Sequence, residues 1–314
     1  MIFYIIGGVI AFLVLSLFLL LIYCYRRIFY AKKRVPLAEN EYDVPTGGPY
    51  DEYYDRLIAW AKLARETPHE DVSVTSFDGL TLRGKYYEYE KGAPIEIMFN
   101  GYRGNAERDM SGGIERCFAL KRSALVVNQR SCGPSDGNCA SFGINESKDC
   151  LTWIDYAINR FGKDCKLIIT GISMGGTTVL ITAGEKLPPN VKYALADCPF
   201  TSAKEIISKV ITEMKLPPKV FYPFIKLSAK IFGGFKLDEN SPINSVKHAT
   251  VPVIILHGDN DAFVPLEMGE RLYNECSAKK ALFISKGADH GLAFPADKEG
   301  YIKAIRDFEQ EIGF

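Results

Sequence analysis

The chain has 314 residues, a length that suits one large α/β domain. With 47% hydrophobic and 24% charged residues it is typical of a globular protein with a sizeable core, and collagen-like, low-complexity and disordered classes are excluded. Basic and acidic residues both number 38, but five basic and no acidic residues fall in the first 35 positions. The remainder is therefore net negative, which argues against a nucleic-acid partner.

The first predicted element is a membrane-spanning helix over residues 1–25. Ile2–Tyr25 has 24 residues without a charge, and a helix of that length would reach about 36 Å, more than the ~30 Å hydrocarbon thickness of a bilayer. No basic residue precedes this stretch, and the sequence after it lacks a small-residue cleavage site, so a retained anchor is favoured over a signal peptide. A buried core helix is the remaining alternative.

Residues 26–50 are predicted to be a basic juxtamembrane segment and a linker. Because lysine and arginine close to a span prefer the cytoplasmic side, the rest of the chain is expected in the cytosol. Seven cysteines outside the span, without zinc-site spacing, suit free thiols there, although Cys132 and Cys139 could pair if the domain were extracytoplasmic. Val35–Pro49 has the proline-rich, aperiodic composition of a tether, so a fragment beginning near Val35 is expected to be soluble and functional. The basic residues of the flank are Arg26, Arg27, Lys32, Lys33 and Arg34.

Residues 51–314 are predicted to form one α/β domain. Asp51–Arg65 is an expected amphipathic helix, and the alternating runs Val72–Phe77 and Leu80–Tyr87 around Asp78-Gly79 predict a hairpin. Short apolar strands then alternate with segments of helical length, which predicts a mostly parallel sheet covered on both faces. The expected strands are Ile95–Phe99, Ala124–Asn128, Leu167–Thr170, Val191–Ala196, Val253–Leu256 and Ala281–Ser285.

The strongest chemical motif is Gly171-Ile-Ser173-Met-Gly175, which directly follows one of these strands and precedes a helical run. A GxSxG sequence in this context is typical of a nucleophile elbow, where the turn strains the serine backbone and glycines permit close approach of the neighbouring chain. A serine hydroxyl needs a base to take its proton and a carboxylate to orient that base. The loops after the last two strands supply both, as Asp261 and His290.

Over Val72–Phe314 the chain resembles the α/β-hydrolase superfamily, in its esterase, lipase and serine aminopeptidase-like branch. The resemblance implies an eight-stranded, mostly parallel sheet with helices on both faces. It also implies an oxyanion hole made by the backbone N–H groups of Met174 and Tyr102. The loop Asn100–Asn105 is similar to the family's His-Gly-x-x-Gly segment, with Asn100 in place of histidine, and Asn128–Ser135 resembles the turn after the fourth strand.

Several residues compete for the acid and base roles. Asp259 lies close to Asp261, and Asp197 follows a strand where some hydrolases keep their acid. Asp289 is expected to be a turn residue. The remaining histidines are expected to be structural, in the case of His257 at a strand end, or exposed, in the case of His69 and His248.

A segment far longer than a simple connection separates Ala196 from Val253 and predicts an insertion. The resemblance implies a small helical lid between strands 6 and 7, over residues 200–248 approximately, covering the serine. Most of its apolar residues are expected to pack the lid onto the body. Three aromatic residues are also candidate substrate contacts: Phe221, Tyr222 and Phe224.

These features predict a membrane-tethered cytoplasmic serine hydrolase that cleaves a carboxylic ester or thioester through an acyl-enzyme. The expected substrate is a small acyl ester or a short peptide, and no metal or cofactor is implied. An aminopeptidase or oligopeptidase of the same fold is the alternative, because a fold alone does not fix the substrate. A catalytically silent binding protein is the alternative from another class, and the presence of all three triad residues argues against it.

Overall fold

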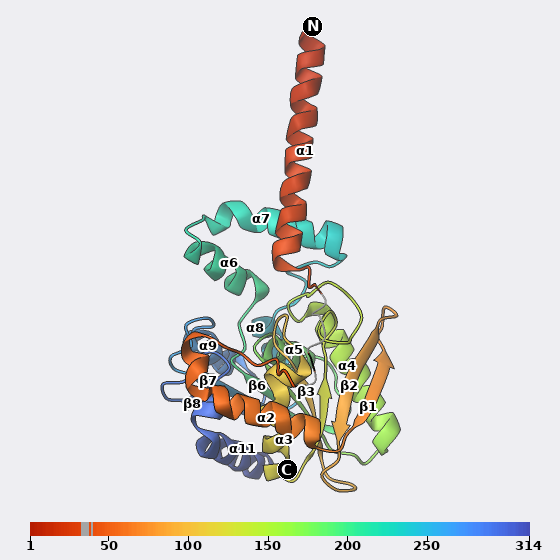
Figure 1. Cartoon of the computed structure of the whole chain (residues 1–314), viewed down its shortest axis with the longest axis vertical. Helices are drawn as coiled ribbons and strands as arrows, with labels where there is room; N and C mark the ends of the chain where they lie inside the picture. Colours follow the sequence, from red (N-terminus) through yellow and green to blue (C-terminus); the bar gives the residue numbers. More distant parts are fainter. Residues whose placement is uncertain (33–37, 39) are drawn as a thin grey trace.

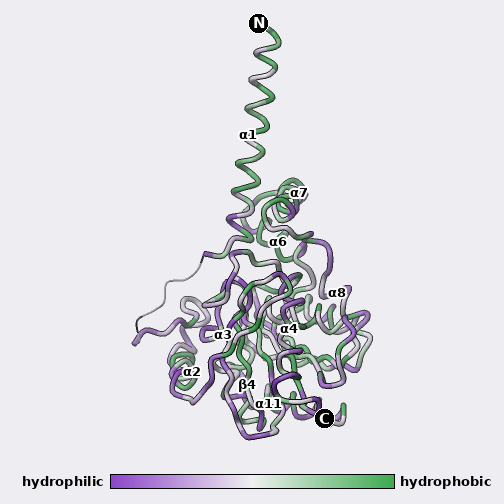
Figure 2. Tube along the Cα trace, turned by 90° about the vertical axis from the view of Figure 1, so that its right-hand side faces the viewer, coloured by the Kyte–Doolittle hydropathy of each residue, from purple (hydrophilic) through white to green (hydrophobic). Residues whose placement is uncertain are grey.

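The computed structural model describes residues 1–32, 38 and 40–314, in which one long helix projects from an α/β body (Figure 1). The projecting helix is α1 (Ile2–Ile28). It is apolar along nearly all of its length (Figure 2), and it is long and apolar enough to cross a membrane. The sequence-predicted positions Lys33 to Leu37 and Glu39, in the flank and tether, lie outside the described residues.

The body is built on one eight-stranded sheet with the strand order β1-β2-β4-β3-β5-β6-β7-β8. β1 pairs antiparallel with β2 and β2 with β4, and all other neighbours are parallel. The predicted α/β-hydrolase fold with an eight-stranded, mostly parallel sheet is therefore confirmed. The strands are β1 (Glu70–Thr75), β2 (Thr81–Tyr87), β3 (Ile95–Phe99), β4 (Ser123–Val127), β5 (Leu167–Ile172), β6 (Val191–Asp197), β7 (Val253–Gly258) and β8 (Lys280–Ser285).

Helices cover both faces of this sheet, and α6 and α7 lie on the side of the body from which α1 projects, with α7 beside the inner part of α1 (Figure 1). The segment predicted as one helix over Asp51–Arg65 is a 3₁₀ helix followed by the α-helix α2. The 3₁₀ helix has Pro49 in its first turn. The elements are η1 (Gly48–Tyr53), α2 (Tyr54–Glu66), α3 (Ala106–Ala119), α4 (Ile144–Phe161), α5 (Met174–Ala183), α6 (Ala203–Glu213), α7 (Pro218–Ser228), η2 (Ala229–Gly233), α8 (Pro242–Ser245), η3 (Val246–His248), α9 (Leu266–Glu275), α10 (Ala293–Ala296) and α11 (Lys298–Ile312).

Alternation along the strands divides the core into two sides. In β3, Ile95, Ile97 and Phe99 join the cluster that includes residues of α4, α5 and α9, whereas Met98 joins the cluster that includes residues of α3. This division follows from the two-residue period of a strand, which sends successive side chains to opposite faces. Because the strands from β3 to β8 are parallel, their carboxyl ends meet at one edge of the body. Loops at this edge can bring distant residues together.

One buried charge lies within β3. Glu96 is buried and its carboxylate accepts a hydrogen bond from Arg122 at 2.6 Å, and it also pairs with Arg116. Burial alone would raise the pKa of Glu96, but the two guanidinium groups outweigh it and lower the pKa to about 2. The cluster ties the sheet to α3 and, through Arg122 and Glu309, to α11.

The inner end of α1 is part of the body. Its side chains are exposed from Ile2 to Leu19, but Leu21 and Cys24 are buried, and Phe29 just beyond the helix is fully buried. The Phe29 ring packs against Phe142 and Phe235, with centroids 5.9 and 5.4 Å away. The expected boundary between anchor and domain therefore does not separate two independent parts.

The described part of the predicted tether also packs on the body. Val44 is buried in the cluster that contains residues of α2 and α11, and Asn105 donates a side-chain hydrogen bond to Asp43 at 2.7 Å. The composition of the segment indicated a tether because its buried residues are isolated and follow no helical or strand period. The structure therefore argues against the expectation that a fragment beginning near Val35 keeps a complete fold, because that fragment lacks Phe29.

We predict that Phe29→Ala destabilises the protein by roughly 3–5 kcal/mol, the usual effect of truncating a buried phenylalanine. The change removes the ring that Phe142 and Phe235 enclose. Thermal unfolding of the full-length protein in detergent measures the effect. Phe3→Ala, which truncates a fully exposed ring on the same helix, is the matched control, and equal melting temperatures for the two variants would show that the end of α1 is not part of the core.

Candidate active site

Ser173 lies in a strained turn between β5 and α5, with φ of 55° and ψ of −116°. A side chain at Gly171 would lie 2.1 Å from the backbone of Gly175, and one at Gly175 would lie 2.0 Å from the carbonyl oxygen of Phe99. Both distances are far below van der Waals contact, so only glycine fits at either position. The sequence motif thus forms the expected elbow, which presents the Ser173 hydroxyl at the carboxyl edge of the sheet.

The structure brings the three predicted triad residues together. His290 Nε2 lies 2.9 Å from Ser173 Oγ, and His290 Nδ1 lies 2.8 Å from Asp261 Oδ2. Asp261 follows β7 and His290 follows β8, so the parallel strands deliver both loops to the elbow. This is the geometry in which a histidine can take the proton of a serine hydroxyl while a carboxylate fixes the ring.

Asp261 is held as an anion. Burial alone would raise its pKa, but hydrogen bonds from His257 and His290 and from the Val264 N–H outweigh burial, and the pKa falls to about 2. The backbone N–H groups of Phe263 and Val264 donate to Oδ1 at 3.0 and 2.7 Å, which leaves Oδ2 for the histidine. The carboxylate is therefore charged throughout the physiological range and can stabilise a protonated His290.

The rival acids have other partners. Asp259 accepts a hydrogen bond from the Gly287 N–H at 2.6 Å, and Asp289 accepts one from the N–H of His290 at 2.6 Å, as a turn residue does. Asp197 is buried, and its Oδ2 accepts from the Tyr301 hydroxyl at 2.9 Å. The geometry thus favours Asp261 as the partner of His290.

His257 contacts the loop that carries Asp261. Its Nε2 lies 2.8 Å from the Val264 carbonyl oxygen and 3.5 Å from Asp261 Oδ2. Burial lowers the pKa of His257, but its hydrogen bonds to Asp261 and Val264 outweigh burial and raise it overall. A structural histidine at a strand end is what the sequence predicted.

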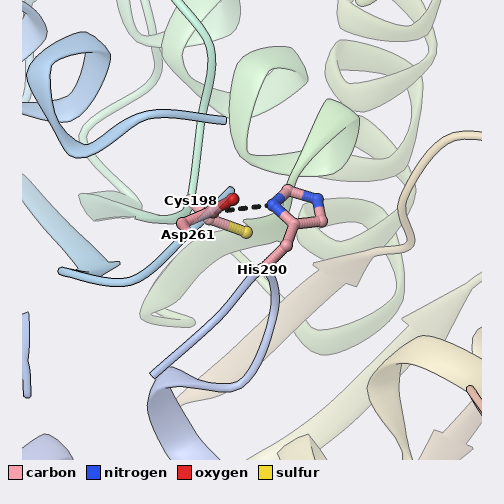
Figure 3. Close-up of side chains that lie close together, drawn as sticks. All are labelled: Cys198, Asp261 and His290. Atoms are coloured by element: carbon pink, nitrogen blue, oxygen red, sulfur yellow. Dashed lines mark hydrogen bonds and ion pairs between the residues drawn. The ribbon is translucent and has the colours of Figure 1, made fainter. Parts of the chain in front are cut away.

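Cys198 is a neighbour of the acid and base that the sequence did not single out. Its Sγ, a carboxylate oxygen of Asp261 and a ring nitrogen of His290 all lie within 4.8 Å of one another (Figure 3). Burial raises the pKa of the Cys198 thiol well above its usual value, which favours the protonated thiol over the thiolate. The trio is therefore an acid–histidine pair with a neutral thiol beside it.

The sequence predicts that the backbone N–H groups of Met174 and Tyr102 form an oxyanion hole. Met174 is the first residue of α5, where N–H groups have no partner within the helix. Gly101 packs on Ser173 so closely that a Cβ there would lie 3.6 Å from the serine Cβ, and no described residue accepts a hydrogen bond from the next N–H, that of Tyr102. Asn100, in the place of the family's histidine, holds this loop through hydrogen bonds to Gly101 and Gln129.

The loop that carries Tyr102 is tied to the end of α1. The Tyr102 hydroxyl donates to the Ile28 carbonyl oxygen at 2.5 Å, and Arg103 donates to the carbonyl oxygens of Arg27 at 3.0 Å and Tyr30 at 2.7 Å. The last carbonyls of a helix lack partners within it and attract cations. The loop therefore caps the end of α1, a contact for which the sequence carries no signal.

A cavity of about 300 Å³ opens beside Ser173 and His290. Phe263 packs its ring edge-on against His290 with centroids 5.1 Å apart, and the Tyr50 hydroxyl donates to the His290 carbonyl oxygen at 3.0 Å. Neither residue was predicted: Tyr50 lies in η1, away from the motifs, and Phe263 lies in the loop of Asp261 at a position to which the sequence assigns no role. The other lining residues are Pro45, Leu57, Gly101, Tyr102, Arg108, Asp109, Ile172, Gly291 and Leu292.

The three lid aromatics predicted as substrate contacts do not line this cavity. Tyr222 is buried, and its hydroxyl donates to Asp238 at 2.5 Å. Phe221 and Phe224 are half-buried in the cluster that joins α6 and α7 to the end of α1. Their observed role is packing, and their contact with substrate stays a prediction.

The fold and the arrangement of this site define an α/β hydrolase. The chain belongs to the prolyl oligopeptidase family, whose model matches residues 140–312, more than half of its length. That segment contains Ser173, Asp261 and His290.

Relatives and solved structures point to the same superfamily. The chain is 28% identical to YqkD of Bacillus subtilis over 59% of this chain and 61% of the relative. It is 26% identical to the lysophosphatidylserine lipase ABHD12 of Danio rerio over 63% of this chain and 52% of the relative. The esterase Pf2001 of Pyrococcus furiosus superposes with a TM-score of 0.64 at 18% identity, covering 90% of this chain and 98% of the esterase, which shows the shared fold.

The rival acids make a direct test possible. We predict that Asp261→Asn lowers kcat by on the order of 10⁴, because an amide cannot stabilise the charged His290 or fix its tautomer. Asp197→Asn should lower kcat by less than about tenfold, since it alters one hydrogen bond away from His290. Kinetics of both variants on one ester substrate decide between them, and the reverse order of effects would reassign the acid.

Proposed function

We propose that this protein is a membrane-anchored serine hydrolase that cleaves a carboxylic ester or thioester. The observation that carries the proposal is the unbroken chain of hydrogen bonds from Asp261 through His290 to Ser173 in the elbow. Ser173 and His290 also line a cavity of about 300 Å³.

The proposed reaction has two halves. Ser173 Oγ attacks the acyl carbonyl carbon while His290 Nε2 takes its proton, and the Met174 and Tyr102 N–H groups hold the oxyanion. The tetrahedral intermediate collapses when His290 gives that proton to the leaving alcohol or thiol. A water molecule then attacks the acyl-enzyme carbonyl while His290 takes its proton. The second tetrahedral intermediate collapses to release the acid as His290 gives that proton to Ser173 Oγ.

An ester is favoured over a peptide by the cavity walls. They are largely apolar and aromatic, through Leu57, Ile172, Phe263 and their neighbours, as suits an acyl group. An aminopeptidase needs a carboxylate for the substrate's amino group, and the lining carboxylate Asp109 already accepts from the Gly101 N–H at 2.9 Å and lies 3.4 Å from Arg108. The ABHD12 relative, named a lysophosphatidylserine lipase, gives further support for a lipid ester.

A serine peptidase is the second candidate, because the family whose model matches the chain is named for oligopeptidases. The catalytic groups required are the same, so the distinction depends on the substrate side of the cavity. A panel that includes both acyl esters and aminoacyl amides separates the two candidates.

We further propose that α1 spans the membrane and that the body lies in the cytosol. The apolar, exposed length of α1 supports the membrane span. The orientation is supported by the positive charges at the inner end of α1, on Arg26, Arg27 and Lys32, because such charges favour the cytoplasmic side. Protease added outside sealed cells should leave the body intact, and its digestion without lysis would reverse the orientation.

The test of the proposed activity is Ser173→Ala in the full-length protein. We predict hydrolysis of short and medium acyl esters by the wild type, and a fall in kcat of on the order of 10⁴ or more in the variant, since His290 then has no hydroxyl to activate. Ser73→Ala, at an exposed position on β1, makes the same chemical change away from the site and should retain full activity. Aminoacyl amides cleaved in preference to every ester would select the peptidase, and equal rates for Ser173→Ala and wild type would reject the mechanism.

A further inference from the structure

The exposed part of α1 is shorter than the apolar stretch in the sequence. Burial begins at Leu21, so the helix is exposed to its surroundings over residues 2–19. At a rise of ~1.5 Å per residue these positions extend about 27 Å, close to the ~30 Å hydrocarbon thickness of a bilayer. If α1 spans the membrane, the membrane surface falls where α1 enters the lid.

α7 and η2 lie at that level. α7 lies across the inner part of α1 (Figure 1). Both α6 and α7 lie near the inner end of α1 (Figure 2). The Phe232 ring, in η2, packs against Phe18 and Tyr25 of α1, with centroids 5.9 and 5.7 Å away. The lid is therefore fixed to the anchor at the depth where hydrocarbon gives way to headgroups.

The two sides of α7 differ. Tyr222, Ile225 and Ser228 are buried, and Tyr222 and Ile225 belong to the cluster that contains Phe142 and Phe200 of the body. The opposite side of α7 exposes Val220 and Leu227, and Ile231 is exposed in η2, with Val220 54% and Ile231 53% exposed. These positions, with Pro223 between them, recur at intervals of three and four residues and so form one apolar stripe. Since the buried side faces the body, the stripe faces away from it.

The charged residues in the stretch of sequence that carries the stripe are all basic. From Met214 to Ile231 the sequence contains four lysines and no acidic residue. Lys219, Lys226 and Lys230 each precede or follow a stripe residue directly, and all three are exposed. Lys226 also pairs with Asp238 at 2.6 Å. An apolar stripe flanked by lysines is the pattern of a helix that lies in the interface of an anionic membrane.

We propose that the outer face of the lid, residues 214–231, docks on the bilayer that α1 spans, with the stripe at the acyl boundary and the lysines at anionic headgroups. The inference rests on the proposed anchoring by α1. A partner protein on this face would have to occupy the space of the membrane around α1, which is why the bilayer is the occupant. The lid beside the active site is then held at the lipid surface.

Tryptophan fluorescence in proteoliposomes tests this with the full-length chain. The protein has two tryptophans, Trp60 and Trp153, both buried in the body, so an added one reports its own site. The probe variant is Leu227→Trp in the stripe, and Lys303→Trp, exposed on α11 at the opposite end of the body (Figure 1), is the control. Leu13→Trp on α1 reports insertion of the anchor. The quencher is phosphatidylserine and phosphatidylcholine brominated near the top of their acyl chains.

We expect strong quenching for Leu13→Trp and Leu227→Trp and none beyond wild type for Lys303→Trp. Quenching of Leu13→Trp alone would overturn lid docking while leaving the anchor in place. A blue-shifted but unquenched Leu227→Trp would mean that protein, such as a second copy, covers the stripe, and this also overturns the proposal. An unquenched Leu13→Trp would remove the anchor on which the inference rests. Hydrolysis of a soluble ester by each variant is measured separately, so a failure of the proposed activity is distinguishable from each of these results.

A second pair of variants tests whether the lysines beside the stripe contribute to docking. Lys219→Glu/Lys230→Glu in the Leu227→Trp background should lose about half or more of the quenching in anionic vesicles, because each lysine near an anionic surface contributes to binding. Lys279→Glu/Lys303→Glu, far from the lid, should leave it unchanged. Equal quenching in both double variants would contradict a role for the lysines and the choice of an anionic surface.

Discussion

The turn at Ser173 is the constraint on which the site depends. A serine at φ of 55° is strained, and the surrounding structure maintains it because β5 ends and α5 begins within one residue, with Gly171 and Gly175 pressed against neighbouring backbone. The strain places the hydroxyl within hydrogen-bond reach of His290 and leaves the Met174 N–H at a helix start. The Ser173 N–H donates to the Asp197 carbonyl oxygen at 2.8 Å, so β6 fixes the turn as well. The sheet thus determines where the nucleophile can be.

The second constraint on the site comes from the end of α1. The loop with the Tyr102 N–H is held at one end by Asp109, which accepts from Gly101, and at the other by the carbonyls of Ile28, Arg27 and Tyr30. An oxyanion donor contributes only if it is preorganised. The end of α1 therefore supports the loop that carries the proposed oxyanion donor, and α1 and the body form one folded unit.

The sequence was sufficient for the fold and for the candidate triad because both depend on local patterns. Strand runs, the glycines of the elbow, and the order of Ser173, Asp261 and His290 can be recognised without knowing any distant contact. It failed where isolated residues pack over long separations. Phe29 and Val44 belong to no periodic stretch. Tyr50 approaches His290 from η1, and Phe263 approaches it from a position of the Asp261 loop that no pattern marks. The lid aromatics show a related limit, since an aromatic stripe predicts burial well but does not say against which surface it packs.

The central claim is that Ser173 is the nucleophile of a hydrolase. The most direct measurement is reaction of the full-length protein in membranes with a fluorophosphonate, followed by mass spectrometry of the modified peptide. The account predicts one covalent adduct, on Ser173, that forms with wild type and is lost in His290→Ala, where no base takes the hydroxyl proton. The absence of any adduct on the folded wild-type protein, or an adduct on a different serine, would contradict it.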